Sequence, residues 1–202
     1  MTTIHSSLNS TRFATRDGFV SDQYIKVNDF NFCPYCEDEH FNILNDWLSR
    51  DYATFWGMQS LTSDERRAEL APTVDKFCLV AYRGGKAVLY IELYDPQYNE
   101  VGKYFDYQHG DCGMHLILAP VEKPENGFSR QAITAVVSLI LEHLGFNRLV
   151  VEPDINNHKI HRLNRTVGIN YSHAIQLENK QAMLGFCTLP EFNAAQAIGA
   201  LS

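Results

Sequence analysis

A histidine and an aspartate stand at the ends of two apolar segments that a helical segment connects. His115 enters the apolar run of residues 114–119, and Asp154 leaves the run of residues 148–152. Chemistry in α/β domains tends to occur where strands end. If the two runs are neighbouring parallel strands, the two side chains face each other as a candidate acid/base pair. Taken singly, a histidine such as His115 is more often a core residue, and helix N-capping explains Asp154.

A second candidate site is the segment Gly127-Phe128-Ser129-Arg130, which opens the long helical segment. Free backbone N–H groups and the helix dipole at such a position bind pyrophosphate, and glycine lets a phosphate approach the backbone. One glycine alone is also an ordinary loop residue. The strand–helix–strand context favours a nucleotide-containing cofactor.

The sequence Cys33-Pro34-Tyr35-Cys36 has the composition of a glutaredoxin active site. Such a motif follows a buried strand, which we do not expect at residues 28–31, and needs a later Thr-Val-Pro loop. Residues 72–74 read Pro-Thr-Val, in the wrong order. A redox module is therefore kept only as the alternative of another class. A zinc site would need a second cysteine pair, which the sequence lacks.

Three further histidines have simpler interpretations. His109-Gly110-Asp111 with a later histidine resembles the iron site of oxygenases, but those sites lie on all-β barrels. A polar loop before a strand explains the motif better. His158 and His161 share one helix without a carboxylate partner, and a solvated helix face explains them.

The elements that must position these residues alternate along the chain. The segments 77–83 and 86–94 predict a β-hairpin around Gly84-Gly85. A strand–helix–strand unit with short connections follows, which implies two parallel neighbours and a right-handed crossover. Gly145 ends its helix. The remaining expected elements are a helix at 40–50, a helix capped by Ser63, strands at 114–119 and 148–152, helices at 128–144 and 157–167, and strands at 171–177 and 182–187.

Composition fits one α/β domain. The chain has 202 residues, 45% of them apolar, and a net charge of −7. The negative charge argues against nucleic acid or anionic membranes as partners. The polar segment 1–12 reads as a flexible arm without the apolar centre of a signal peptide, and no apolar stretch is long enough for a membrane span. Five cysteines without a framework spacing fit a reducing cytoplasm.

Several motifs occur in one order along the chain between about residues 41 and 192, and together they resemble the GNAT acyltransferases that build hydroxamate siderophores. The chain is similar to the short stand-alone form, with residues 13–202 as one domain. The motifs are Trp47-Leu48 with Phe55-Trp56-Gly57-Met58, Tyr90-Ile91-Glu92-Leu93-Tyr94, Asp111-Cys112-Gly113-Met114-His115-Leu116, Val150-Val151-Glu152-Pro153-Asp154 with Asn157, and Leu177-Glu178-Asn179-Lys180-Gln181-Ala182.

The resemblance implies a GNAT fold: a central mixed sheet splayed between its fourth and fifth strands, with flanking helices. It implies an acyl-CoA wedged between those strands and no metal. His115 and Asp154 match the family's residues at the substrate nitrogen. The remaining matches are Leu116, Ile117, Leu118, Gly127, Phe128, Ser129, Arg130 and Asn157 for the cofactor, and Trp56, Glu92 and Tyr94 for the substrate.

Two positions depart from the family's pattern. Glu125 stands where the phosphate loop usually has a glycine two residues before Gly127. Asn164 stands near the position where many family members have a tyrosine that protonates the leaving thiolate. The second departure shifts the proton chemistry to His115 and Asp154.

The implied reaction is N-acylation of an N-hydroxylated amine. Such an amine is far less basic than an alkylamine, so it is largely neutral and nucleophilic near pH 7, and the product is a hydroxamate. We expect N-hydroxycadaverine or N-hydroxyputrescine as acceptor with succinyl-CoA as donor, and N6-hydroxylysine with acetyl-CoA as the alternative. The resemblance also implies a functional link to an amine N-monooxygenase and a siderophore synthetase, and a monomer or homodimer.

Overall fold

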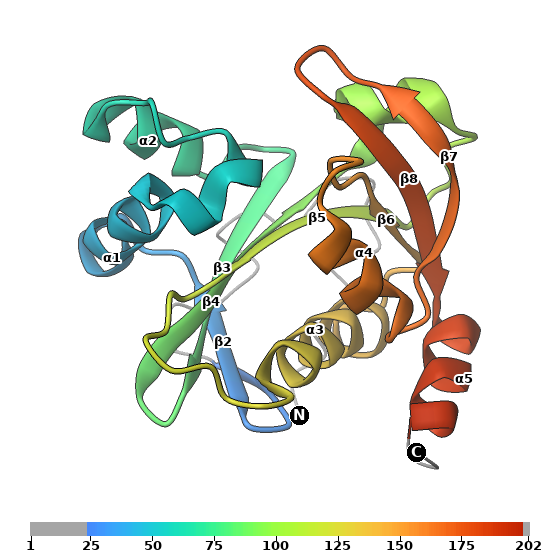
Figure 1. The fold of residues 1–202 in the computed structure, drawn as a ribbon. Helices are drawn as coiled ribbons and strands as arrows, with labels where there is room; N and C mark the ends of the chain where they lie inside the picture. The colour runs from blue at the N-terminus through green and yellow to red at the C-terminus, as the bar shows by residue number, and fades with distance from the viewer. Residues whose placement is uncertain (1–23, 200–202) are drawn as a thin grey trace.

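Eight strands form one mixed sheet in the order β1-β2-β3-β4-β5-β6-β8-β7 (Figure 1). The computed structural model describes residues 24–199, so the predicted arm at 1–12 lies outside the described residues. All neighbours pair antiparallel except β5 and β6. The strands are β1 (Ile25–Val27), β2 (Phe30–Pro34), β3 (Lys76–Arg83), β4 (Lys86–Tyr94), β5 (Asp111–Leu118), β6 (Arg148–Val151), β7 (Asn170–Gln176) and β8 (Gln181–Thr188).

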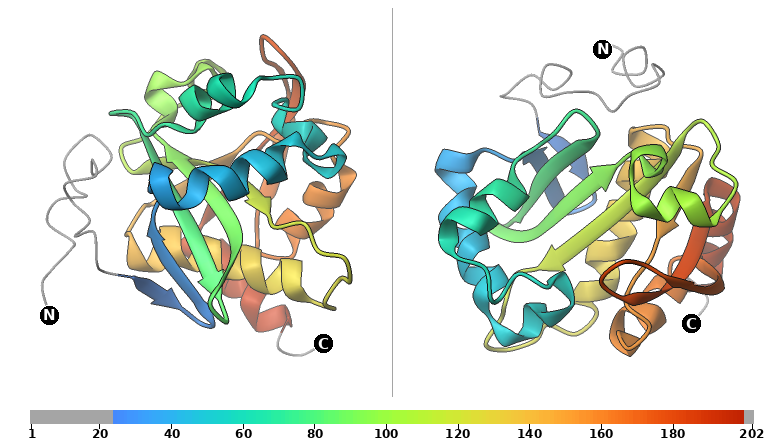
Figure 2. Two further views of the ribbon diagram at one scale, coloured as in Figure 1. Left: turned by 90° about the vertical axis from the view of Figure 1, so that its left-hand side faces the viewer. Right: turned by 90° about the horizontal axis from the view of Figure 1, so that it is seen from above.

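Helices cover both faces of this sheet, with α1 and α2 on one face and α3 on the other (Figure 2). None of the helices within residues 24–199 is long and apolar enough to cross a membrane. The helices are α1 (Glu37–Ser49), η3 (Asp51–Trp56), α2 (Ser63–Leu70), η4 (Pro96–Tyr98), η5 (Glu100–Tyr104), α3 (Phe128–Ser138), the π-helical η6 (Leu139–His143), α4 (His158–Arg165) and α5 (Leu189–Gly199).

The predicted order of strands and helices from the hairpin to β8 is confirmed, whereas η4, η5 and the C-terminal α5 were not predicted. Two local details also differ. The N-cap of α2 is Thr62, not Ser63. Its hydroxyl accepts the N–H of Glu65, and the Glu65 carboxylate accepts the N–H of Thr62 at 2.7 Å, which completes a capping box. The long helix continues past Ser138 as η6, and Gly145 follows its end with φ of 75°.

The two faces of the sheet bury different cores because successive side chains of a strand point to opposite sides. In β3, Leu79 packs with the apolar face of α3, whereas Val80 packs against α1 and α2. The residues expected to form the apolar face of the long helix are all buried: Ile133, Val136, Val137, Ile140, Leu141 and Leu144.

The parallel pair β5 and β6 is joined at one end only. Register partners run from Asp111↔Arg148 to Gly113↔Val150, although β5 continues to Leu118. Arg148 clamps the joined end through Nε and a terminal nitrogen, 2.8 and 2.7 Å from the two Asp111 oxygens. Beyond Gly113 the strands diverge. The expected splay is therefore confirmed, and it lies between β5 and β6 because the short β1 adds one strand before it.

Candidate active site

The splay opens into a cavity of about 470 Å³. On the face of the sheet that α1 covers, the cavity lies between two apolar clusters, one around Tyr90 and Ile117 and the other around Val150. It also reaches α4, which packs with α3 and contributes Ile160 and Asn164 to the lining. Its lining consists of Thr54, Phe55, Trp56, Gly57, Met58, Glu69, Glu92, Met114, His115, Leu116, Val151, Glu152, Pro153, Asp154, Asn157, Ile160, Asn164, Asn179 and Lys180.

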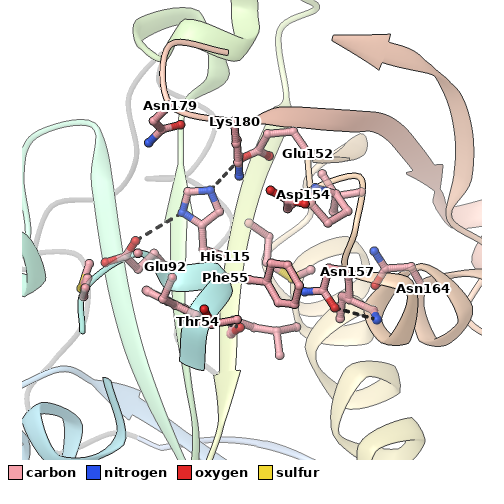
Figure 3. A pocket seen from close by; sticks show the side chains of 18 of the residues that line it. Thr54, Phe55, Glu92, His115, Glu152, Asp154, Asn157, Asn164, Asn179 and Lys180 are labelled. Atoms are coloured by element: carbon pink, nitrogen blue, oxygen red, sulfur yellow. Dashed lines mark hydrogen bonds and ion pairs between the residues drawn. The ribbon is translucent and has the colours of Figure 1, made fainter. Parts of the chain in front are cut away.

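His115 lies between two buried carboxylates (Figure 3). Its Nε2 is 2.6 Å from Oε1 of Glu152, and its Nδ1 is 3.4 Å from Oε2 of Glu92. The two glutamates are only 4% and 5% exposed. Glu92 stands directly opposite His115 in the β4–β5 register, and Glu152 directly follows β6. The splay therefore places one ionisable residue from each of three successive strands on one line.

The two carboxylates decide the charge of this histidine. Burial alone lowers the pKa of His115, but the charge of Glu152 and the hydrogen bonds to Glu152 and Glu92 outweigh it and raise the pKa to about 9. Burial raises the pKa of each glutamate, yet the His115 cation and hydrogen bonds hold both below their usual range. The group is therefore an imidazolium between two carboxylates at neutral pH.

Each carboxylate also has a lysine close to it. Lys76 Nζ lies 3.2 Å from Glu92 Oε1, and the Tyr90 hydroxyl donates to the same oxygen at 3.0 Å. Lys180 Nζ lies 3.9 Å from Glu152 Oε1. Buried carboxylates require such compensation, because an unpaired charge away from water is costly.

Tyr94, expected to bind the substrate, is not among the cavity-lining residues. Its hydroxyl donates to Glu152 Oε2 at 2.7 Å, and its ring centroid is 4.9 Å from that of His115. Gly113 makes room for this ring, since a Cβ there would lie 2.1 Å from a Tyr94 carbon. Tyr94 therefore orients Glu152 and His115 from behind. The other two expected substrate-binding residues, Trp56 and Glu92, do line the cavity.

His115 and Asp154 line the same cavity, but no hydrogen bond or ion pair joins them among the described residues. The direct pairing expected from the sequence is wrong, because Glu152 and Glu92 occupy both ring nitrogens of His115. Asp154 Oδ1 accepts the N–H of Asn156 at 2.7 Å. The N-cap of α4 is Asn157, whose Oδ1 accepts the Ile160 N–H at 3.3 Å.

Side chains of η3 cover part of the β5 edge that was expected to hold the cofactor. Trp56 Nε1 donates to the carbonyl oxygen of Leu116 at 3.1 Å, and the Tyr52 hydroxyl to that of Leu118 at 3.0 Å. The N–H and C=O of one strand residue point to the same edge, so the N–H groups of Leu116 and Leu118 face the splay as well. Ile117 points its backbone toward β4, which removes it from that edge.

The expected phosphate loop lies at the N-terminus of α3 and outside the cavity lining. Gly127 is the N-cap with φ of 79°, a conformation that glycine adopts readily. The Phe128 N–H donates to the Glu125 carbonyl at 3.3 Å, and its side chain packs on the core. The N–H groups of the first helical turn lack intrahelical partners. The backbone N–H groups of Ser129 and Arg130 are therefore better placed than that of Phe128 to donate hydrogen bonds to an anion.

The cysteine pair does stand between a strand and a helix, contrary to expectation. Cys33 is in β2, which contains the buried Phe32, and Cys36 is the N-cap of α1. Both thiols are free. Burial, with the Glu39 charge adding to it, raises the pKa of Cys33 to about 11, whereas a redox-active thiol needs a lowered pKa. The strand before the motif therefore does not argue against a redox role, as the sequence had suggested. The raised pKa of Cys33 does.

The remaining histidine motifs have structural roles. Asp111 binds Arg148, as described for the joined strand end. His161 is 6% exposed, and its Nε2 lies 2.9 Å from the Asp154 carbonyl oxygen, so the expectation of a solvated face is wrong for His161. His158 is exposed, as expected. Within residues 24–199 no three His, Cys, Asp or Glu side chains are arranged to hold a metal ion.

Six polar residues of the cavity lining were not predicted from the sequence as site residues: Thr54, Glu69, Glu152, Asn164, Asn179 and Lys180. Glu152 had a local signal, since an acidic residue directly after a buried strand is either paired or functional. Glu69 and Lys180 come from α2 and the β7–β8 turn, and only the tertiary structure brings them to the splay.

The fold and the cavity at the splayed strands define a class. The family described as "Acetyltransferase (GNAT) domain" matches residues 37–177, and the chain belongs to this family. Membership confirms the expected N-acyltransferase class and, with it, an acyl-CoA as co-substrate.

Individual relatives are more distant. The chain is 29% identical over 108 residues to the N-hydroxyputrescine acetyltransferase of Acinetobacter baumannii, across 54% of this chain and 51% of that protein. The chain thus aligns with about half the length of this curated relative. A solved structure of an uncharacterized Bacillus halodurans protein has a TM-score of 0.76 at 18% identity, over 87% of this chain and 94% of that one. A structure of AAC(6')-Ib with coenzyme A and kanamycin has a TM-score of 0.72 at 16% identity, over 83% and 99%. The two structural likenesses show the fold alone.

Proposed function

We propose that the protein transfers the acyl group of a short acyl-CoA to the hydroxylamine nitrogen of an N-hydroxylated diamine, N-hydroxyputrescine or N-hydroxycadaverine. The product is a hydroxamate, whose two oxygens chelate ferric iron. The proposal rests on the charge of the cavity, on the motifs of the siderophore branch and on the named relative.

The observation that carries the choice of acceptor is an excess of carboxylates in the cavity. Glu92 and Glu152 are compensated by lysines and by His115. Glu69 and Asp154 also line the cavity, and neither has an ion-pair partner among the described residues. Within residues 24–199 no arginine lines the cavity to receive the α-carboxylate of N6-hydroxylysine. The distal ammonium of a diamine suits these two carboxylates, whereas an amino acid adds a negative charge.

In the proposed reaction Asp154 takes the proton of the attacking nitrogen, and His115 supplies a fixed positive charge. A hydroxylamine is neutral near pH 7, so it needs orientation and one proton acceptor. His115 has both ring nitrogens engaged, and its pKa, raised to about 9, favours the protonated form near pH 7. The Asp154 carboxylate has only the Asn156 N–H as a described partner. The N–H of Leu116 at the splay is positioned to stabilise the thioester oxygen as negative charge develops on it.

For the donor we place acetyl-CoA before succinyl-CoA, which reverses the order expected from the resemblance. A succinyl group brings a distal carboxylate, and the lysine that lines the cavity, Lys180, already lies 3.9 Å from Glu152. The name of the relative also specifies an acetyl donor.

The test is a matrix of acetyl-, succinyl- and malonyl-CoA against N-hydroxyputrescine, N-hydroxycadaverine, N6-hydroxylysine and N-hydroxybutylamine. The last compound keeps the nucleophile and lacks the distal ammonium. We expect the highest kcat/KM with a hydroxydiamine. A preference for N6-hydroxylysine, or equal rates with N-hydroxybutylamine, would contradict the proposed acceptor.

The variant Glu69→Gln tests whether Glu69 binds the distal ammonium of the acceptor. One exposed ion pair contributes at most about 1 kcal/mol, so KM for N-hydroxyputrescine should rise roughly 3- to 6-fold with little change in kcat. Kinetics with N-hydroxybutylamine should not change. Asp64→Asn is the matched control, because Asp64 lies on the same helix and does not line the cavity. An equal effect of Glu69→Gln on both acceptors would remove Glu69 from the ammonium site.

A further inference from the structure

We infer that Glu100, which does not line the cavity, is a positioning residue that holds the β7–β8 turn in place as one wall of the acceptor site. The inference concerns the shape of the cavity, so it rests on acyl transfer to an amine and not on which amine that is. Glu100 begins η5, and the light-green segment η4–η5 packs against the β7–β8 hairpin (Figure 1).

The β7–β8 turn contributes polar side chains to the cavity but has little support of its own. Asn179 and Lys180 line the cavity, and Lys180 Nζ lies 3.9 Å from Glu152 Oε1 (Figure 3). The last register pair of the hairpin is Gln176↔Gln181, and β7 is an edge strand of the sheet. A two-stranded tip is only marginally stable by itself. The placement of these two side chains therefore depends on what holds the turn from outside.

η5 holds the turn through two hydrogen bonds. Both carboxylate oxygens of Glu100 accept the backbone N–H of Glu178, at 3.1 Å for Oε1 and 3.0 Å for Oε2. The hydroxyl of Tyr104 donates to the carbonyl oxygen of Gln176. A hydrogen bond to an ionised acceptor is stronger than one between neutral groups. Because Glu178 directly precedes Asn179, the Glu100 carboxylate fixes the turn one residue away from the cavity lining.

η5 is a firm support because it is packed into the protein. Val101 is buried, and it belongs to the same apolar cluster as Leu177 of the turn. Asn99 caps η5, with its Oδ1 3.2 Å from the Val101 N–H. η5 also packs closely on η4, since a Cβ at Gly102 would lie 2.3 Å from the Pro96 carbonyl oxygen. The connection between β4 and β5 is therefore a fixed base for the side chain that holds the turn.

An open groove lies between η4–η5 and the turn, beside these hydrogen bonds. Among the residues that line it are Tyr98, Glu100 and Lys103 from the first segment, and Gln176, Leu177 and Glu178 from the turn and the strand before it. Packing does not fill this space, so the bond from Glu100 to the Glu178 N–H crosses it. Loss of that bond should let the tip of the turn move while the apolar cluster beneath it stays packed.

Movement of the turn should affect acceptor binding more than the reaction step. When a cavity wall is in place only part of the time, the apparent affinity falls in proportion to that fraction. The groups proposed for the reaction, His115 and Asp154, are not part of the turn. We therefore expect a change in KM for the acceptor with little change in kcat.

Substitutions at the two ends of the hydrogen bond test this role. Glu100→Ala removes the acceptor, and Glu178→Pro removes the N–H donor at a turn position that can accept proline. Each should raise KM for the acceptor about 3- to 10-fold, with kcat within about 2-fold of wild type. The double variant should be no worse than either single variant, because both remove the same bond. Unchanged KM in folded Glu100→Ala would overturn the assignment, and this variant alone decides if Glu178→Pro does not fold.

Glu100→Gln and Glu178→Ala are the matched controls. Glutamine keeps one oxygen that can accept the N–H, and alanine keeps the N–H, so both variants should have a KM within about 2-fold of wild type. A rise in Glu100→Gln equal to that in Glu100→Ala would contradict a hydrogen-bonding role. CoA affinity, measured by calorimetry without acceptor, should be the same in all four single variants. A parallel loss of CoA affinity would indicate general disorder of the cavity and would also overturn the assignment.

Hydrogen exchange without any substrate tests the movement of the turn itself. The amides of residues 177–181 should exchange about 3- to 10-fold faster in Glu100→Ala than in wild type, whereas those of β5 should not change. This readout stays valid if the acceptor is not a hydroxydiamine, and KM is then measured with the amine that the donor–acceptor matrix selects. Unchanged exchange at the turn, or a lower unfolding temperature with unchanged KM, would give Glu100 a purely structural role and overturn the inference.

Discussion

At the scale of single residues, the charge state of His115 changes how the site works. A histidine at the end of a strand suggests a base, but this one has a carboxylate on each ring nitrogen and a pKa of about 9. It is a cation held by two anions, so it serves orientation and electrostatics. The free cavity-lining carboxylates, above all Asp154, are better placed to accept a proton.

The pH dependence of the free energy of unfolding should report the charge of His115. The folded pKa of His115, about 9, is above the unfolded value of about 6.5. Its contribution is therefore complete below about pH 6.5 and is lost as pH rises through about 9. The glutamates, with lowered pKa values, contribute above about pH 4.5 and lose their contribution below it. Urea unfolding across this range should show maximal stability from about pH 4.5 to 6.5, with a decline toward pH 9.

His115→Asn is the control for the pH profile. It retains a polar side chain of similar size and cannot ionise, so the decline above about pH 6.5 should flatten. The same slope in wild type and variant would mean that another group titrates there.

The kcat values of single variants should test the separate roles of Asp154 and His115. Positioned acid/base groups supply about 10² to 10⁴ in rate, so Asp154→Asn should lower kcat by that order, with CoA binding little changed. The loss should be smallest at high pH, where hydroxide competes as proton acceptor. His115→Asn should also lower kcat, because it removes the fixed positive charge of the site. Near-normal turnover in both folded single variants would assign the pair a structural role.

At the scale of elements, the crossover helix α3 has two tasks, one for its apolar face and one for its N-terminus. Its apolar face covers the sheet through Ile133 and Val136, and its N-terminus presents backbone N–H groups to solvent. The first task follows from amphipathic spacing. The second follows from the geometry of any helix start, so it needs a functional test.

Gly127→Asp tests the pyrophosphate site at that N-terminus. A carboxylate beside the N–H groups competes with and repels a phosphate, so affinity for CoA should fall about 10-fold or more by calorimetry. Gly127→Asn is the matched control, since it imposes the same strain at φ of 79° and a similar size without the charge. Equal affinities of the two variants would remove this loop from the phosphate site.

At the scale of the whole molecule, the cysteine pair lies where β2 ends and α1 begins. In the sheet, three strands separate β2 from β6, so the pair lies away from the splay. Cys33 belongs to a strand whose side chains pack in the core, and Cys36 is exposed. The two cysteines therefore belong to a sheet with the strand order of a GNAT domain and not that of a thioredoxin.

The double variant Cys33→Ser, Cys36→Ser should therefore keep acyl transfer within about 2-fold of wild type, with a stability loss within about 1 kcal/mol. Thiol oxidants should leave wild-type turnover unchanged. Loss of turnover in the folded variant, together with inactivation of the wild type by oxidants, would establish a redox function.

The sequence by itself determined the strands from the hairpin to β8, the crossover helix and the two strands that part, because these depend on local periodicity and on glycines at turns. It did not predict η4, η5 or α5. It also brought His115 and Asp154 to one region, since each stands at the end of a recognisable strand, and the family resemblance added Glu92. The partners of His115 were decided by the tertiary structure alone. Register across three strands selects Glu92 and Glu152 instead of Asp154, and the β7–β8 turn and α2 deliver Lys180 and Glu69 from distant parts of the chain. The charge of a site depends on such non-local neighbours, so its acid and base roles could be assigned only after the chain was folded.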